Sequence, residues 1–166
     1  MNVERFRWVA AVVAAHPGGR VVGRTRLQKE MRLLQRLGMP SDYDFRIHYY
    51  GPYSEGLQAD VNLLEQFGLV SEDVRVSQDG SLYSVFEAKH TSDLPDTNKY
   101  RTAIELLSKT DSVVLELAAT YDAFREGGLE PERALSALRA KKGSKCDGGK
   151  ESQALELLKV LRLQSA

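Results

Sequence analysis

The dipeptide Asp79-Gly80 stands between two short runs of β-branched and aromatic residues, and this pattern constrains the fold more than any other in the chain. Asp-Gly favours a tight turn because both residues tolerate the positive φ angles that hairpin turns require. The runs on either side have the composition of strands. We therefore expect an antiparallel hairpin within residues 74–88, folded around Gln78-Asp79-Gly80-Ser81.

Hydrophobic spacing predicts that the chain before this hairpin is mainly helical. Leu27, Met31 and Leu34 recur at the i, i+4 and i+7 positions of one helix face, and Gly38 ends the pattern. In chain order, the expected elements are a helix at about residues 3–16, a turn at Gly18-Gly19, a helix from Thr25 to before Gly38, a strand within residues 45–50, a turn at 51–54, and a helix that Ser54 caps and Gly68 ends.

The polar, proline-containing segment 89–98 is expected to be a surface linker, and the remainder to be helical. Helices are predicted near 104–110, 112–126, 131–138 and 152–163, with Asp111 or Ser112 as a cap. The expected fold class is therefore mainly α with a small β-hairpin. The order of elements is compatible with a winged helix-turn-helix-like N-terminal half (1–90) packed against a C-terminal helical bundle (98–166). Because both halves are small and apolar on one face, we expect a single domain, 1–166.

Composition argues against a membrane-spanning or disordered protein. Apolar residues make up 42% of the 166 residues and charged residues 28%, and no apolar run approaches the ~20 residues that a spanning helix needs. Cys146 has no second cysteine with which to form an internal disulfide, so a reducing cytoplasm is the expected compartment. Charge is unevenly distributed: residues 1–52 carry nine Lys or Arg against four Asp or Glu, whereas residues 53–98 carry two against nine.

Three blocks of residues resemble a known family. They are Gly23-Arg24-Thr25-Arg26-Leu27-Gln28-Lys29; Tyr50-Gly51-Pro52-Tyr53-Ser54 with Leu57 and Asp60; and Gly68-Leu69-Val70. In this order and spacing they resemble the uncharacterised bacterial YwgA-like proteins and, more distantly, the Panacea domain of SocA-like antitoxins. The resemblance implies a small non-enzymatic module, associated in the Panacea case with antitoxins and adaptors. At Glu30 the chain departs from the family pattern, which places an apolar residue there.

The second expected helix carries candidate binding residues for a nucleic acid or an acidic partner. Successive 100° steps place Lys29, Arg32 and Arg36 within about 60° of one another, opposite the apolar stripe. With Arg24 and Arg26 at the start of the helix, they form a basic face suited to phosphates or carboxylates. The alternative interpretation is the solvated outer face of an ordinary surface helix.

The third expected helix disfavours conventional DNA readout. In a winged-helix protein this helix would lie in the major groove, yet its exposed side carries Glu55 and Glu65 and neither lysine nor arginine. If nucleic acid binds, the basic helix or the lysines of the 141–150 loop are expected to carry the contact.

Aromatic residues form a second candidate surface. Tyr50 and Tyr53, close to His48 and Tyr49, are candidate partner-binding residues because aromatic rings stack on bases or on proline-rich segments. The alternative is a half-buried strand and turn.

The chain shows no zinc-binding histidine pair, serine elbow or phosphate-binding glycine loop, so no catalytic residue, cofactor or metal site is predicted. The leading hypothesis is a non-enzymatic regulatory or adaptor module that binds a protein partner, antitoxin-like in role. A winged-helix DNA-binding transcriptional regulator is the alternative. The C-terminal helices are compatible both with homodimerisation and with closing the monomer's own core.

Overall fold

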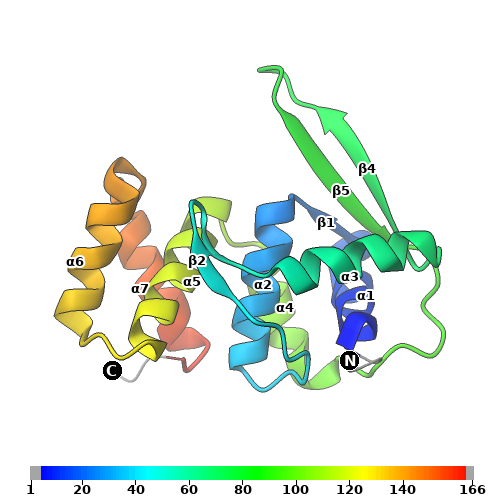
Figure 1. The fold of residues 1–166 in the computed structure, drawn as a ribbon, viewed down its shortest axis with the longest axis horizontal. Helices are drawn as coiled ribbons and strands as arrows, with labels where there is room; N and C mark the ends of the chain where they lie inside the picture. The colour runs from blue at the N-terminus through cyan, green and yellow to red at the C-terminus, as the bar shows by residue number, and fades with distance from the viewer. Residues whose placement is uncertain (1–4, 164–166) are drawn as a thin grey trace.

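Helices make up most of the structure, a computed structural model that describes residues 5–163 (Figure 1). The helices are α1 (Arg5–Ala15), α2 (Arg24–Arg36), α3 (Glu55–Gln66), α4 (Arg101–Ser108), α5 (Ser112–Glu126), α6 (Pro131–Lys142) and α7 (Lys150–Val160). The strands are β1 (Arg20–Val22), β2 (Arg46–His48), β3 (Gly51–Tyr53), β4 (Val70–Val76) and β5 (Leu82–Ala88). The prediction of a mainly helical protein with a small antiparallel sheet is confirmed. Residues 3 and 4, expected in the first helix, lie outside the described residues.

A three-stranded antiparallel sheet has the strand order β1-β5-β4. The hairpin expected around Asp79-Gly80 is confirmed, because β4 and β5 pair in a continuous register from Val70↔Ala88 to Val76↔Leu82. Strand β1 was not expected, since the sequence predicted a turn and then the second helix. Its three residues extend because they pair with β5, with Val21 opposite Phe86 and both side chains in the core.

A second, two-stranded sheet joins β2 to β3 in the register His48↔Gly51. The prediction of a turn at residues 51–54 is therefore wrong: the turn lies at Tyr49-Tyr50, and β3 follows it directly. Gly51 allows this because its φ is +95°, a conformation that residues with a Cβ rarely adopt. A Cβ at Gly51 would also overlap Thr120 Oγ1 on α5. Glycine at this position thus lets the small sheet approach the helix.

Helix α5 lies between α2 and the α6–α7 pair (Figure 1), and contacts all three. Leu117 and Ala118 of α5 are completely buried, and one continuous core extends from Val9 on α1 to Leu161 beyond α7. The apolar stripes expected on α2 and α3 both lie in this core. Helix α6 continues to Lys142 rather than ending at Leu138, so the expected 141–150 loop is shorter than predicted.

Local signals place several helix ends correctly. Ser54 caps α3 by accepting a hydrogen bond from the backbone N–H of Leu57, and Asp111 caps α5 by accepting from Val113 and Val114. Among residues 5–163, no helix combines the length and the apolar character that crossing a membrane requires.

Candidate partner-binding site

The basic residues of α2 do not form an exposed face. Lys29 is 1% exposed and Arg32 is buried, because α5 packs over the side of α2 that was expected to face solvent. Arg36 Nε donates to Asp122 Oδ2 at 2.8 Å, and Arg32 lies 3.5 Å from the same carboxylate. The expectation of a solvated basic surface is therefore wrong for Lys29 and Arg32, and Arg36 is engaged in an ion pair within the chain.

The other two predicted arginines lie at the start of α2 and have separate partners. Arg24 is half exposed and donates to Glu72 on β4 at 2.6 Å. Arg26 donates to the carbonyl oxygens of Leu107 and Thr110 at 2.8 and 2.5 Å. Leu107 lies in the last turn of α4 and Thr110 just after the helix ends, a region in which backbone carbonyls lack partners within the helix. Arg26 is thus a structural bridge between α2 and α4.

Four of the seven predicted residues, Arg24, Lys29, Tyr50 and Tyr53, line a single cavity of about 330 Å³. We call it the tyrosine cavity. It lies between the N-terminal half of α2, the β2–β3 sheet and α3. Its lining residues are Arg24, Thr25, Gln28, Lys29, His48, Tyr49, Tyr50, Tyr53 and Gln58. The structure therefore brings the predicted aromatic residues together with two of the predicted cations, and it places Arg26, Arg32 and Arg36 elsewhere.

The aromatic side of the cavity is built by the β2–β3 turn. Tyr49 is 80% exposed and Tyr50 is 53% exposed, and their rings pack edge to face with centroids 4.9 Å apart. The His48 and Tyr53 rings lie 5.2 Å apart across the same small sheet. Large aromatic side chains this exposed leave apolar area in contact with water, which is typical of binding surfaces. The alternative interpretation, a half-buried strand and turn, is correct for Tyr53, which is partly buried on β3, but Tyr49 is mostly exposed.

The floor of the cavity is held by side-chain bonds to the backbone of the β3–α3 junction. Gln28 donates to the carbonyl oxygen of Ser54 at 3.0 Å and accepts from its backbone N–H at 2.8 Å. Lys29 Nζ donates to the carbonyl oxygen of Pro52 at 2.7 Å. These bonds fix the small sheet against α2, and so they fix the position of the aromatic turn.

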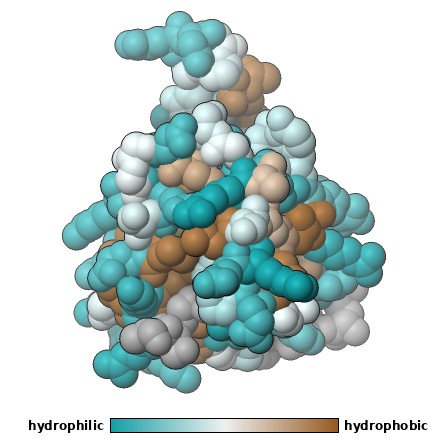
Figure 2. All heavy atoms as spheres, turned by 90° about the vertical axis from the view of Figure 1, so that its left-hand side faces the viewer, coloured by the Kyte–Doolittle hydropathy of each residue, from teal (hydrophilic) through white to brown (hydrophobic). Residues whose placement is uncertain are grey.

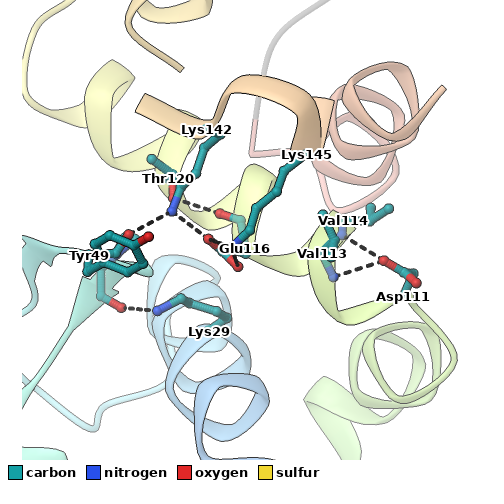
Figure 3. A network of polar contacts seen from close by, with 10 residues as sticks. Lys29, Tyr49, Asp111, Val113, Val114, Glu116, Thr120, Lys142 and Lys145 are labelled. Atoms are coloured by element: carbon teal, nitrogen blue, oxygen red, sulfur yellow. Dashed lines mark hydrogen bonds and ion pairs between the residues drawn. The ribbon is translucent and has the colours of Figure 1, made fainter. Parts of the chain in front are cut away.

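Behind the turn lies a buried charge cluster in which two lysines contact one carboxylate (Figure 3). Glu116 on α5 accepts from Lys142 Nζ at 2.5 Å and from Lys145 Nζ at 3.0 Å. Lys142 also donates to the carbonyl oxygen of Tyr49 at 3.2 Å, and Lys145 lies 5.1 Å from the centre of the Tyr50 ring. The end of α6 and the turn that follows it thereby hold both exposed tyrosines in place.

Burial of Lys29 beside this cluster changes its titration. Desolvation lowers the pKa of Lys29, the charge of Glu116 opposes this shift and the positive charges of Lys142 and Lys145 add to it, so that the pKa is about 8. Glu116 was not among the site residues predicted from the sequence. Its signal was a single carboxylate in the apolar run Val113–Ala119, which is unusual unless the charge is paired.

The arrangement favours an anionic ligand group next to an apolar or aromatic one. The tyrosine cavity is lined by four aromatic rings, two cations and no carboxylate among its described residues. Cations near aromatic faces attract carboxylates and phosphates, while the rings supply contact area. Among residues 5–163, no group of three or more His, Cys, Asp or Glu side chains is placed to hold a metal ion.

Fold and cavity together define a mainly helical protein with a small antiparallel sheet and an aromatic, basic cavity between α2, α3 and the β2–β3 strands. No family model matches the chain. It is 32% identical over 123 residues to the uncharacterized protein YwgA of Bacillus subtilis (strain 168), and the alignment covers 69% of this chain and 70% of YwgA. The chain therefore belongs to the YwgA family.

Glu30, where the chain departs from the family pattern, has a specific partner in the structure. It is completely buried, and His16 Nε2 lies 2.6 Å from Glu30 Oε2. His16 Nδ1 lies 2.7 Å from the carbonyl oxygen of Val12. The two residues form a buried polar pair that joins the end of α1 to α2, so the charge at position 30 is compensated within the chain.

Proposed function

We propose that the protein is a non-enzymatic, cytoplasmic regulatory or adaptor module that binds a protein partner through the tyrosine cavity. The observation that carries this proposal is the exposed Tyr49–Tyr50 pair at the rim of a cavity whose described lining residues include two cations and no carboxylate. Tyrosine and arginine are enriched among the residues that dominate the energy of protein interfaces. Lys29 Nζ, the one amine among the described lining residues, is buried and bonded to a backbone carbonyl, which supports a structural role rather than a catalytic one.

The rim is preorganised for binding. The carbonyl of Tyr49 is held by Lys142, and the Tyr50 ring lies next to Lys145, so the turn enters a complex with little further ordering. Less ordering on binding means a smaller entropic cost. The chemistry of the lining selects an acidic partner segment that presents an aromatic or aliphatic side chain to the rings. If the more distant resemblance to the Panacea domain extends to function, this partner would be a toxin that the protein neutralises.

The test is selection of binding peptides from a random displayed library, followed by titration of the enriched peptides against purified variants. We expect peptides in which Asp or Glu flanks an aromatic or aliphatic residue. Their affinity should fall by about tenfold or more in a Tyr49→Ala/Tyr50→Ala variant, as for loss of central aromatic contacts. Tyr83→Ala is the matched control, because Tyr83 is a partly exposed tyrosine on β5 outside the cavity lining. Enriched peptides without acidic residues, or equal losses in both variants, would overturn the proposal.

A second candidate function, a winged-helix DNA-binding transcriptional regulator, is favoured by the strand order. β1 lies between α1 and α2 in the chain, pairs with β5, and is followed by α2, α3 and the β4–β5 hairpin. This order supports a winged-helix arrangement in which α3 would be the recognition helix. Against DNA binding, Glu55 and Glu65 are exposed on α3, where they would repel phosphates.

Fluorescence anisotropy tests this second candidate by measuring binding of the protein to random-sequence duplex DNA across a salt series. A regulator that uses α3 should bind duplex at low salt, lose affinity steeply as salt rises, and weaken in a Gln58→Ala/Asn62→Ala variant. No binding at low salt would eliminate it and leave the protein-binding proposal standing.

A further inference from the structure

The outer half of the β4–β5 hairpin extends beyond the helical body (Figure 1) and is strongly apolar on one face. Val76 is 65% exposed and Leu82 is 70% exposed, and Val74 is more than half exposed on the same face. Figure 2 shows this as apolar atoms, in brown, just below the hydrophilic tip of the hairpin at the top of the view. Exposed apolar side chains on a projecting hairpin mark an interaction surface.

Strand β4 is also an unpaired edge of the sheet. In the order β1-β5-β4, one side of β4 bonds to β5, and no strand within residues 5–163 pairs with its other side. All seven residues of β4 are paired in register, without a bulge, and the strand contains no proline. Natural edge strands limit further pairing with bulges, proline or charged side chains, and of these β4 has the charges, so a strand of complementary charge can pair there. This edge is therefore a template for another strand.

The hairpin's own hydrogen bonds reveal which backbone groups face the free edge. Ser77 N–H donates to the Ser81 carbonyl and Lys89 N–H donates to the Leu69 carbonyl, both at 2.8 Å. Antiparallel ladders alternate between bonded and non-bonded pairs, so the odd-numbered residues of β4 direct their backbone groups toward β5. The even-numbered residues, Val74 among them, direct their N–H and C=O groups outward.

The charges along this edge are complementary to a second copy of the same edge. Asp73 and Arg75 are exposed, lie on one face of β4 and form an ion pair with each other at 2.9 Å. In an antiparallel pair of β4 strands with its two-fold axis at Val74, the Asp73 of each copy lies directly opposite the Arg75 of the other. A register centred on Asp73 or on Arg75 would instead place like charges opposite each other, which is destabilising.

We propose that two copies of this chain associate through antiparallel pairing of their β4 edges, in the register centred on Val74. The two Val74 residues then form a bonded pair, and Glu72 of each copy pairs with Val76 of the other. The Asp73 and Arg75 side chains alternate in sign on one face, and on the other face the exposed apolar residues of the two hairpins meet at the Val74 pair, across four strands. A two-fold axis makes this interface closed, so the association stops at a dimer.

Sedimentation velocity over a concentration series, with two charge reversals, tests the interface. We expect the wild-type chain to dimerise, and Asp73→Arg or Arg75→Asp alone to raise the dimer dissociation constant about tenfold or more, since each variant places like charges opposite each other twice. An equimolar mixture of the two single variants, one of them fluorescently labelled, should form a mixed dimer. Within each variant chain, residues 73 and 75 still carry the same charge after mixing. A restored dimer can therefore come only from contact between the two different chains.

Two further variants separate this edge from other interfaces. Val74→Pro removes one outward N–H without removing a bond to β5, and should abolish the dimer while circular dichroism shows a folded chain. Val160→Asp changes an exposed residue of α7 and should leave the dimer intact, because the C-terminal helices are not the interface. A monomeric wild-type chain at its highest soluble concentration would overturn the proposal, as would failure of the single variants to form a mixed dimer, or loss of the dimer in Val160→Asp.

Discussion

Replacing Glu116 with glutamine removes the carboxylate that Lys142 and Lys145 both contact behind the tyrosine cavity. The Glu116 and Lys142 side chains are 5% and 2% exposed, and their Oε1 and Nζ atoms are 2.5 Å apart. The amide of Glu116→Gln keeps the shape of the side chain but cannot compensate the lysine charge. Removing one partner of a buried ion pair costs about 3–5 kcal/mol. Glutamine can still accept a hydrogen bond, so we expect about 3 kcal/mol at pH 7, a large share of a typical folding free energy.

The stability cost of Glu116→Gln should depend on pH, because it depends on how many of the neighbouring lysines are charged. Desolvation lowers the pKa of Lys29 to about 8 and also lowers the pKa of Lys142. For a base with a lowered pKa in the folded state, the unfolded chain holds more protons above pH 8, so stability from this group rises with pH up to its unfolded pKa of 10.5. As the lysines lose charge there is less positive charge for Glu116 to compensate. The cost of Glu116→Gln should therefore be smaller at pH 10 than at pH 7.

Urea unfolding, followed by the fluorescence of the single tryptophan, measures both quantities. Trp8 packs edge to face against Tyr100 at 6.0 Å, so its emission should change when the core opens. Lys145→Met is the matched control: it removes a partner of Glu116 that is 37% exposed and should cost less than about 1 kcal/mol. The reasoning is refuted if Glu116→Gln costs no more than this control. An equal cost at pH 7 and pH 10 would assign the effect to packing instead of charge.

The same unfolding assay tests three other sites. Gly51→Ala should lower the free energy of unfolding by at least about 2 kcal/mol, because alanine there has a positive φ and its Cβ overlaps Thr120. Adding Thr120→Ala should recover part of this stability. Strictly additive costs of the two substitutions would contradict the overlap. Burial lowers the pKa of His16. The hydrogen bond and the negative charge of Glu30 raise it, as does the carbonyl of Val12, so that the pKa of His16 in the folded chain lies above 6.5. Stability from this pair should be fully present below pH 6.5 and be lost as pH rises through the folded pKa, so the wild-type chain should lose more thermal stability across that range than His16→Gln does. Asp122→Asn should cost about 3 kcal/mol at both pH 7 and pH 10, because Arg32 and Arg36 keep their charge but lose their buried partner and retain the half-exposed Glu126; a cost that shrank at pH 10 would argue against this assignment.

Features that depend on neighbouring residues were predictable from the sequence. The apolar stripes of α2 and α3 are buried, Ser54 and Asp111 cap the helices that they precede, and Asp79-Gly80 lies in the turn of the hairpin. Each of these rests on physics that acts within a few residues: helical periodicity, the unpaired N–H groups of a helix start, and the backbone preferences of a tight turn.

Features that depend on residues far away in the chain were not predictable from the sequence. Strand β1 exists because β5, more than sixty residues later, supplies its hydrogen bonds. Gly51-Pro52-Tyr53 has the sequence of a turn, yet it forms β3 because β2 and α5 lie against it. Short segments have weak local preferences, so tertiary contacts decide their conformation.

The candidate site shows the same division. The sequence by itself determined that Lys29, Arg32 and Arg36 lie opposite the apolar stripe of α2, and that Tyr50 and Tyr53 lie close to each other in the chain. Only the tertiary structure decided that α5 covers this basic side with Asp122, and that Arg24 and Lys29 meet the tyrosines in one cavity. Helical periodicity fixes the angle of a side chain around its own axis, but whether that direction leads to water, to a carboxylate or to a cavity depends on elements that pack there from elsewhere in the chain.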